Sequence, residues 1–339
     1  MNMQETHPPI KMADSPSVRA LVTGNPVALA HGVIGDAWTQ LILREAFYGV
    51  RRFNDWSEAL HIPRTVLSGR LKRLVENGLL DSVIPPGRRR AEYRLTAMGR
   101  DLFGIALMQG RWERDHAPSR MQSRYDMVFY DPATRKALDP VVLDGPGGST
   151  IDPENVGWEV GPGLVERESP TQRRWRSKRP PVDRPMIDRS VELIGDYWSW
   201  MVLGCAFFRL RRFEQFLSAT GMAPNILSDR LNRLVGGSIL VRRAYQSSPP
   251  RSEYRLTEAG RALYPVVLAT HGWSLRWLCD QDAPPLSLVD LTTGKPIHPV
   301  VCDRNTGEPI QAARTRWVME GQSASRSRGD SIAGGSIAG

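Results

Sequence analysis

The stretch Leu67-Ser-Gly-Arg-Leu-Lys-Arg-Leu74 returns 160 residues later, almost unchanged, as Leu227-Ser-Asp-Arg-Leu-Asn-Arg-Leu234. In both stretches the leucines recur every three or four residues, which is the spacing of one face of an α-helix. The pattern therefore predicts two equivalent helices, each with a buried leucine face and a polar outer face.

The sequence around this stretch is duplicated as well. In the first copy the flanking motifs are Ile34-Gly-Asp-Ala-Trp38, Arg51-Arg-Phe53 and Glu92-Tyr-Arg-Leu-Thr96. Their counterparts in the second copy are Ile194-Gly-Asp-Tyr-Trp198, Arg211-Arg-Phe213 and Glu253-Tyr-Arg-Leu-Thr257. A nearly constant offset over so many motifs indicates a duplicated domain. A length of 339 residues agrees with this, because one hydrophobic core rarely organises so long a chain.

Within each copy, the motifs predict a fixed order of elements. In the first copy we expect a helix over Leu29 to Phe47, a short helix over Arg52 to His61, and the leucine helix, which ends at Gly78. Two short strands then flank a basic turn at residues 85–90, and Thr96 caps a closing helix. This order is that of a winged helix-turn-helix. The fold class we predict is mainly α with small β-hairpin wings (α+β), in two tandem copies.

A fainter repeat follows each winged helix. Pro140-Val-Val142 and Trp158 match Pro299-Val-Val301 and Trp317, so each copy carries a small appendage of strands and turns. The clustered arginines after Gly161 cannot form a core and indicate a linker. The segments we expect are a disordered lead (1–24, with one short helix near Val18), winged-helix domain 1 (25–118), β appendage 1 (125–160), a flexible basic linker (161–185), winged-helix domain 2 (186–280), β appendage 2 (285–320) and a disordered tail (321–339).

Charge and composition narrow the classes of function. A net charge of +9 and a pI near 9.8 favour an anionic partner, nucleic acid before a membrane surface. The longest apolar run, 200–208, is far shorter than the roughly 20 residues that span a bilayer, so we expect a cytoplasmic protein. Three cysteines and six histidines lie too far apart for a metal site or a catalytic pair, and Gly145-Pro-Gly-Gly-Ser-Thr150 lacks the lysine of a phosphate loop. We therefore expect no enzyme activity, cofactor or metal.

The candidate DNA contacts follow from the second helix of a helix-turn-helix, which enters the major groove. If the leucines face inward, Arg64, Thr65, Ser68 and Lys72 face outward in the first copy. The remaining candidates are the arginines of the first wing and the less basic equivalents in the second copy: Arg88, Arg89, Arg90, Asn225, Ser228 and Arg251. Arg70 and Arg230 lie between the leucines, and the sequence leaves open whether they contact DNA or an acidic neighbour. Because Pro224 and Asn232 replace Arg64 and Lys72, we expect the first copy to supply most of the DNA affinity.

Taken together, these motifs resemble the HxlR family of bacterial winged-helix transcription regulators, once in each copy. The resemblance implies DNA binding as a dimer, with the first and last helices at the dimer interface. Asn25 and Pro185 stand where family members often carry a redox-sensitive cysteine. In the appendages, only Cys302 remains of the cysteines that some members place in a similar, zinc-ribbon-like hairpin. One thiolate cannot hold a structural zinc, which needs four ligands, so we expect neither zinc nor thiol sensing.

The function we predict is sequence-specific transcriptional regulation by an intramolecular pseudo-dimer on an imperfect inverted repeat. Two chains that pair copy to copy, as a homodimer, are the alternative assembly. The alternative function is that of a protein-interaction adaptor that has lost specific DNA binding. A pocket for a small-molecule effector between the copies is compatible with the sequence, which identifies neither the ligand nor the operator.

Overall fold

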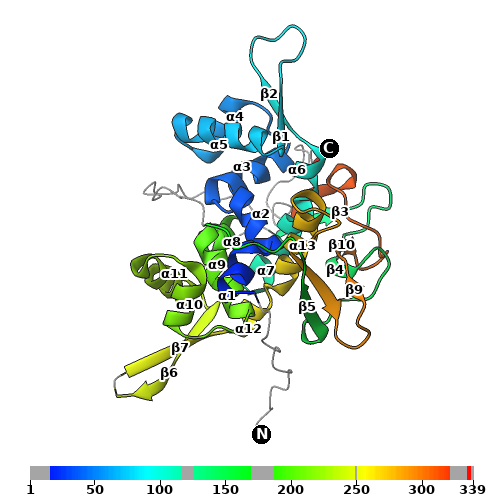
Figure 1. Cartoon of the computed structure of the whole chain (residues 1–339). Helices are drawn as coiled ribbons and strands as arrows, with labels where there is room; N and C mark the ends of the chain where they lie inside the picture. The colour runs from blue at the N-terminus through cyan, green and yellow to red at the C-terminus, as the bar shows by residue number, and fades with distance from the viewer. Residues whose placement is uncertain (1–15, 117–125, 169–186, 249, 321–333, 337–339) are drawn as a thin grey trace.

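The computed structural model describes residues 16–116, 126–168, 187–248, 250–320 and 334–336. The first winged helix has the predicted order of elements (Figure 1). Its elements are α2 (Pro26–Ile34), α3 (Ala37–Phe47), α4 (Phe53–Leu60), α5 (Arg64–Glu76), β1 (Leu80–Val83), β2 (Glu92–Leu95), α6 (Ala97–Asp101) and α7 (Phe103–His116). The second winged helix repeats this order with α8 (Asp188–Ile194), α9 (Tyr197–Phe207), α10 (Phe213–Thr220), α11 (Pro224–Gly236), β6 (Leu240–Ser247), β7 (Pro250–Leu256), α12 (Glu258–Arg261) and α13 (Tyr264–Trp277).

The helix expected from Leu29 to Phe47 is in fact two helices, α2 and α3. The Asp36 carboxylate accepts a hydrogen bond from the Thr39 amide (3.1 Å), which satisfies a free donor of a new first turn. Asp196 caps α9 in the same way. The apolar periodicity continues through the break, which is why the sequence pattern alone indicated one helix.

The appendages exchange strands between the two copies. Their elements are β3 (Asp126–Tyr130), β4 (Pro140–Asp144), η2 (Pro153–Asn155), β5 (Val156–Val160), β8 (Leu286–Asp290), β9 (Pro296–Ile297), β10 (Pro299–Asp303), η3 (Ala312–Arg314) and β11 (Arg316–Glu320). Strand β3 pairs with β11, β4 with β10 and β5 with β8, all antiparallel. Val142 lies opposite Val301, its own counterpart in the repeat. An approximate two-fold axis therefore relates the copies and passes between these two valines.

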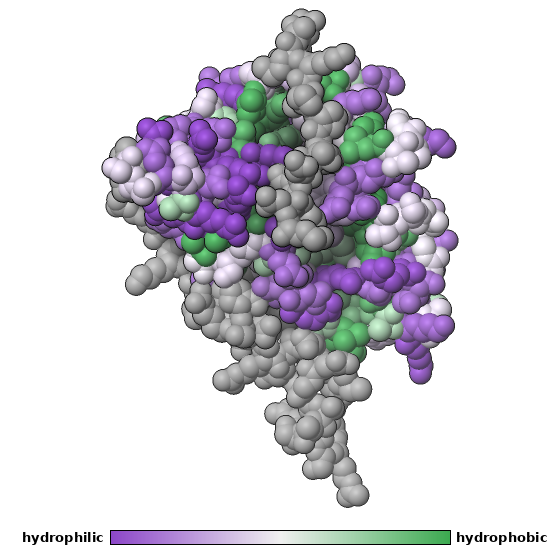
Figure 2. Space-filling model, turned by 90° about the horizontal axis from the view of Figure 1, so that it is seen from below, coloured by the Kyte–Doolittle hydropathy of each residue, from purple (hydrophilic) through white to green (hydrophobic). Residues whose placement is uncertain are grey.

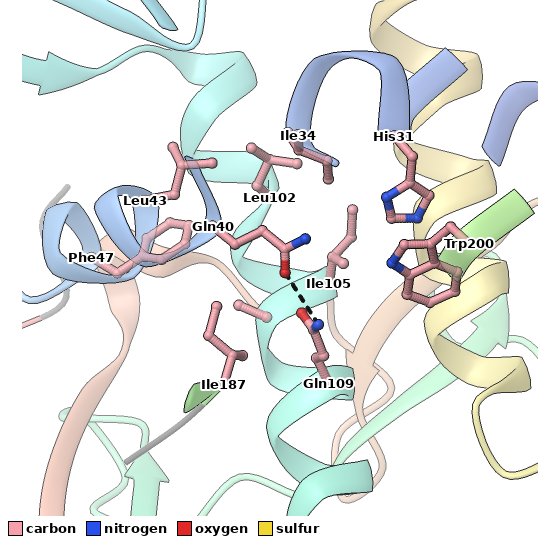
Figure 3. Close-up of a pocket in the computed structure, with 11 residues that line it drawn as sticks. His31, Ile34, Gln40, Leu43, Phe47, Leu102, Ile105, Gln109, Ile187 and Trp200 are labelled. Carbon is pink, nitrogen blue, oxygen red and sulfur yellow. Dashed lines mark hydrogen bonds between the residues drawn. The ribbon is translucent and has the colours of Figure 1, made fainter. Parts of the chain in front are cut away.

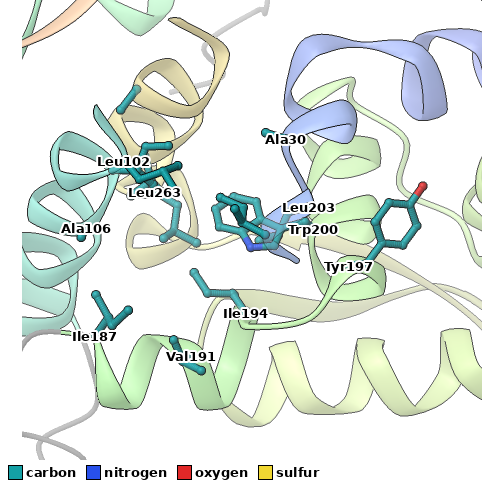
Figure 4. Close-up of a cluster of buried hydrophobic side chains, with 14 of the residues drawn as sticks. Ala30, Leu102, Ala106, Ile187, Val191, Ile194, Tyr197, Trp200, Leu203 and Leu263 are labelled. Carbon is teal, nitrogen blue, oxygen red and sulfur yellow. The ribbon is translucent and has the colours of Figure 1, made fainter. Parts of the chain in front are cut away.

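The helices are exchanged around the same axis. Helix α2 packs against α9 and α13 of the second copy, and α8 packs against α3 and α7 of the first. Trp112 Nε1 donates to the Ala259 carbonyl (2.7 Å), and its counterpart Trp273 donates to the Met98 carbonyl (3.1 Å). A single hydrophobic core runs through both copies, and Figure 4 shows side chains of α7, α8 and α9 meeting in it. The two copies are therefore interleaved rather than separate.

The short helix expected near Val18, within an otherwise disordered lead, is helix α1 (Val18–Gly24). This helix packs against α10, and its buried face includes Leu21 and Val22. The start of the expected linker covers it: Arg19 forms an ion pair with Glu166 (3.2 Å), and Thr23 Oγ1 accepts from the Arg167 amide (3.2 Å). The local sequence did not reveal these contacts, because both partners lie more than 140 residues away in the chain.

The structure describes part of the expected tail but not the basic cluster of the expected linker. Strand β12 (Gly334–Ser336), in the expected disordered tail, pairs with β11. The basic cluster of the linker, 173–179, lies outside the described residues. In the described part of the chain, no helix is long and apolar enough to cross a membrane.

Candidate nucleic-acid interface

The leucine faces of α5 and α11 are buried, as the spacing predicted. Leu67 and Leu71 of α5 are buried, and so are their counterparts Leu227 and Leu231 of α11. Helix α4 is held against α3 by Trp56, whose Nε1 donates to the Ile42 carbonyl (3.1 Å). Burial of this face leaves a matched outer face in each copy. The exposed or partly exposed residues on it are Arg64, Thr65, Ser68, Lys72, Asn225, Ser228 and Asn232.

Two cations of this outer face remain accessible in the first copy. The guanidinium carbon of Arg64 lies 5.0 Å from the centroid of the Phe53 ring, and Arg64 Nη2 donates to Asn54 Oδ1 at 3.4 Å. Lys72 Nζ lies 3.7 Å from Glu76 Oε1, with 77% of its side chain exposed. An exposed pair of this kind contributes little to stability. Both side chains can therefore turn to a phosphate or a base edge.

Arg70 and Arg230 bind acidic neighbours instead. Arg70 Nε donates to Asp36 Oδ1 at 2.9 Å, and the two side chains are only 12% and 14% exposed. In the second copy Arg230 Nε donates to Asp196 Oδ1 at 2.8 Å, and Arg233 also reaches this carboxylate (3.1 Å). The sequence left open whether these arginines contact DNA or an acidic neighbour. In the structure both form an ion pair with an acidic neighbour. They tie α5 to the N-cap of α3 and α11 to the N-cap of α9.

The first wing carries three arginines between its strands, in addition to Arg94 on β2. Arg88, Arg89 and Arg90 are exposed after the turn at Gly87, whose φ is +75°. Arg88 Nη1 forms an ion pair with Glu92 Oε1 (2.7 Å). Arg89 and Arg90 form no ion pair with any residue that the structure describes. Of the three arginines, Arg89 and Arg90 are therefore the more available for contact with a phosphate.

The second wing is longer and more basic than its turn residues alone indicated. Arg251 is exposed, as are Arg242 and Arg243 on strand β6. The counterparts of Arg242 and Arg243 in the first copy are Ser82 and Val83. The prediction compared only the arginines at the wing tips. The difference in wing charge is therefore smaller than expected, although Val241-Arg-Arg243 was visible in the sequence.

The two helix-turn-helix units lie on the same side of the molecule (Figure 1). In Figure 1, α4 and α5 lie above the central helices on the left, α10 and α11 lie below them on the same side, and the wings project from opposite ends. Seen from below, the surface is mostly hydrophilic, with separate small apolar patches (Figure 2).

The positions considered for sensing have structural roles or lie outside the described residues. Asn25 Oδ1 accepts from the Ala28 amide (3.0 Å) and caps α2, while Pro185 is among the residues not described. Cys205 and Cys302 are buried, and burial raises the pKa of both thiols. A protonated buried thiol reacts slowly with oxidants. Within the described residues, no group of three histidine, cysteine, aspartate or glutamate side chains could hold a metal ion.

Comparison with known proteins agrees with this geometry. The model of the HxlR-like helix-turn-helix family matches residues 33–121 and 193–282, a little over half of the chain. The chain belongs to the HxlR-like helix-turn-helix family. Each match begins at the end of α2 or α8 and covers the rest of that winged helix, so the family's domain is present twice.

Individual relatives of the HxlR-like family match about one copy. The uncharacterized HTH-type transcriptional regulator Rv3095 of Mycobacterium tuberculosis is 41% identical over 142 residues, which are 42% of this chain and 89% of that protein. The uncharacterized HTH-type transcriptional regulator sll1512 of a Synechocystis strain is 38% identical over 104 residues, 30% of this chain and 76% of that protein. The crystal structure of PA1607 is 34% identical, covers 37% of this chain and 87% of its own, and superposes with a TM-score of 0.34.

Proposed function

We propose that this protein is a transcriptional regulator that binds double-stranded DNA through both winged helices of one chain. The observation that carries the proposal is the reciprocal exchange of strands and helices around one axis, with an exposed outer face on α5 and on α11. Two recognition helices related by a two-fold axis suit an inverted repeat with half-sites about one helical turn apart or a multiple of it. The chain thus presents by itself what a single-copy relative presents by dimerisation.

The site we propose is an imperfect inverted repeat, because the two outer faces differ. Arg64 and Lys72 can contact guanine edges or phosphates, whereas Pro224 and Asn232 offer no cation. The two copies share one core and therefore have one defined relative orientation in the free chain. The chain should therefore bind a non-palindromic site in one direction, which a symmetric homodimer cannot do.

The deciding experiment selects DNA from a random library with the full chain and then measures affinity for the winning site at several salt concentrations. We expect two unequal half-sites and a steep loss of affinity with salt, because bound phosphates release counterions. Weak binding that ignores sequence and salt would instead support an adaptor that binds proteins.

Variants assign the contributions of the copies. Arg64→Ala and Lys72→Ala should weaken binding more than Asn225→Ala and Asn232→Ala, which act as matched controls on the second outer face. Loss of a bidentate arginine costs about 1–3 kcal/mol of discrimination at one base, whereas loss of a phosphate-binding lysine mainly lowers the salt dependence. Equal losses from both copies would contradict the predicted dominance of the first.

A further inference from the structure

A small cavity of about 30 Å³ lies inside the core where the two copies meet (Figure 3). The first copy contributes His31 from α2, Gln40 and Phe47 from α3 and Gln109 from α7. The second copy contributes Ile187 and Trp200. The cavity is therefore formed only when the two copies are in contact.

The polar groups at this cavity are incompletely satisfied. The rings of His31 and Trp200 stack with centroids 4.3 Å apart, and both residues are only 2% exposed. Within the described part of the chain, neither ring nitrogen of His31 nor Nε1 of Trp200 has a hydrogen-bond partner. Each buried polar group left unpaired costs free energy. An occupant that both donates and accepts hydrogen bonds would remove this cost.

The lining also restricts the charge of an occupant. It contains no aspartate, glutamate, lysine or arginine side chain among the described residues, and Gln109 Nε2 donates to Gln40 Oε1 at 3.3 Å. Burial lowers the pKa of His31 to about 3, so its ring is neutral near pH 7. An ion placed here would lose its hydration without a counter-charge, which is strongly unfavourable.

The polar residues are distributed unequally about the two-fold axis. Gln40 and Trp200 occupy equivalent positions of the repeat, whereas His31 corresponds to Val191 and Gln109 to Thr270. The Thr270 hydroxyl already donates to the Val266 carbonyl (2.7 Å). The first copy therefore supplies most of the polar groups, and the duplicated chain holds one such site instead of a symmetric pair.

We propose that this cavity is an effector site for one small, uncharged molecule with hydrogen-bonding groups. In this arrangement of the copies, the cavity has room for about two water molecules. A molecule of the size of phenol is larger, so the two copies must move apart at the seam to admit it. A ligand that prefers one arrangement of the copies shifts the equilibrium toward that arrangement.

The cavity lies one helical turn from the contacts that hold both recognition helices. Gln40 N donates to the Asp36 carbonyl (3.1 Å), and Asp36 binds Arg70 of α5. Trp200 N likewise donates to the Asp196 carbonyl (3.3 Å), and Asp196 binds Arg230 of α11. Displacement of α3 against α9 therefore changes the relation of α5 to α11. This regulatory effect rests on the proposed DNA-binding function, whereas ligand binding itself does not.

The test uses benzamide and phenol as neutral probes and benzoate as a charged control of similar shape. Calorimetry on the full chain should show saturable binding in the millimolar range, one neutral probe per chain, and none of benzoate. His31→Val, which installs the residue of the second copy, should weaken binding at least tenfold. Gln109→Thr likewise installs the residue of the second copy and should also weaken binding. It keeps the test valid if His31→Val fails to fold.

DNA binding supplies the second measurement. A neutral probe should change the affinity of the full chain for its selected site, and should leave that of the His31→Val variant unchanged. Without a probe, this variant should bind DNA like the parent chain, which separates failure of the pocket from failure of the proposed function. The site would be overturned by any of three results. These are two probes bound per chain, binding that neither variant weakens, and no saturable binding of either neutral probe. Probe binding without any change in DNA affinity would overturn its regulatory role.

Discussion

Arg64 and Arg70 lie on the same helix, two turns apart at most, yet their surroundings differ completely. Arg64 is exposed and rests on the Phe53 ring, whereas Arg70 is largely buried against Asp36. An exposed arginine can exchange its contacts for those of DNA at little cost. A buried one cannot leave its partner without exposing an uncompensated charge. Residue type therefore does not decide which cation is available to DNA.

We predict that Arg70→Gln lowers the free energy of unfolding by about 1–3 kcal/mol, because Asp36 keeps its burial but loses a charged partner. Arg64→Gln should change stability by less than about 0.5 kcal/mol, as expected for an exposed side chain. Urea unfolding of both variants makes the comparison. Equal stability of the two variants would show that the ion pair contributes nothing.

Two buried histidines should make the stability depend on pH. Burial lowers the pKa of His31 to about 3 and that of His271 to about 4. The unfolded chain, with histidine pKa values near 6.5, binds these protons first, so stability falls as the pH drops below about 6.5 and is unaffected by these groups above it.

The replacement His31→Val should flatten this dependence by up to about 1.4 kcal/mol per pH unit. Unfolding at a series of pH values between about 4 and 8 measures it, with the exposed His61→Asn variant as control. The same slope in the parent chain and in His31→Val would show that His31 is not held neutral.

Among the elements, the two wings differ more in length than in basic character. The β1–β2 hairpin has four residues in each strand, with Arg94 on β2 and Arg88, Arg89 and Arg90 between the strands. The β6–β7 hairpin has eight and seven, and carries Arg242 and Arg243 within a strand. Cations spread along a hairpin can follow a phosphate backbone over a longer distance.

We predict that replacing Arg242 by Ser and Arg243 by Val, the residues of the first wing, weakens DNA binding uniformly across sequences. Each phosphate that is no longer neutralised should lower the slope of log affinity against log salt by about 0.9. Anisotropy titrations give the slope, and the Arg89→Ser, Arg90→Ser double variant provides the comparison from the first wing. A slope that changes only with the first wing would show that the second wing stays off the DNA.

At the scale of the whole molecule, we propose that the exchange of elements takes the place of dimerisation. The pairing of β4 with β10 and the reciprocal tryptophan hydrogen bonds join the two copies within one chain. Tethering raises the effective concentration of the copies to the millimolar range, which favours pairing within the chain. A second chain would have to displace contacts that are already made.

We therefore predict a mass of 38.0 kDa in solution, both free and, after subtraction of the DNA, on one operator. Light scattering at micromolar concentration measures it. Chains cut between 169 and 186 provide a further check, because the two pieces should stay together through their shared core. A free mass of twice 38.0 kDa would instead indicate that two chains pair copy to copy.

The sequence by itself determined the duplication, the order of helices and wings, and the outward face of each recognition helix. These features depend on local periodicity, caps and turn residues, which are read within a few residues of each other. Only the tertiary structure decided the partner of Arg70, the docking of α1 on α10 and the exchange of strands between copies. The strand β4 would fit an antiparallel neighbour from either copy, because backbone hydrogen bonding does not distinguish them. The choice between copies rests on the shared core, in which residues more than 140 positions apart along the chain are buried together.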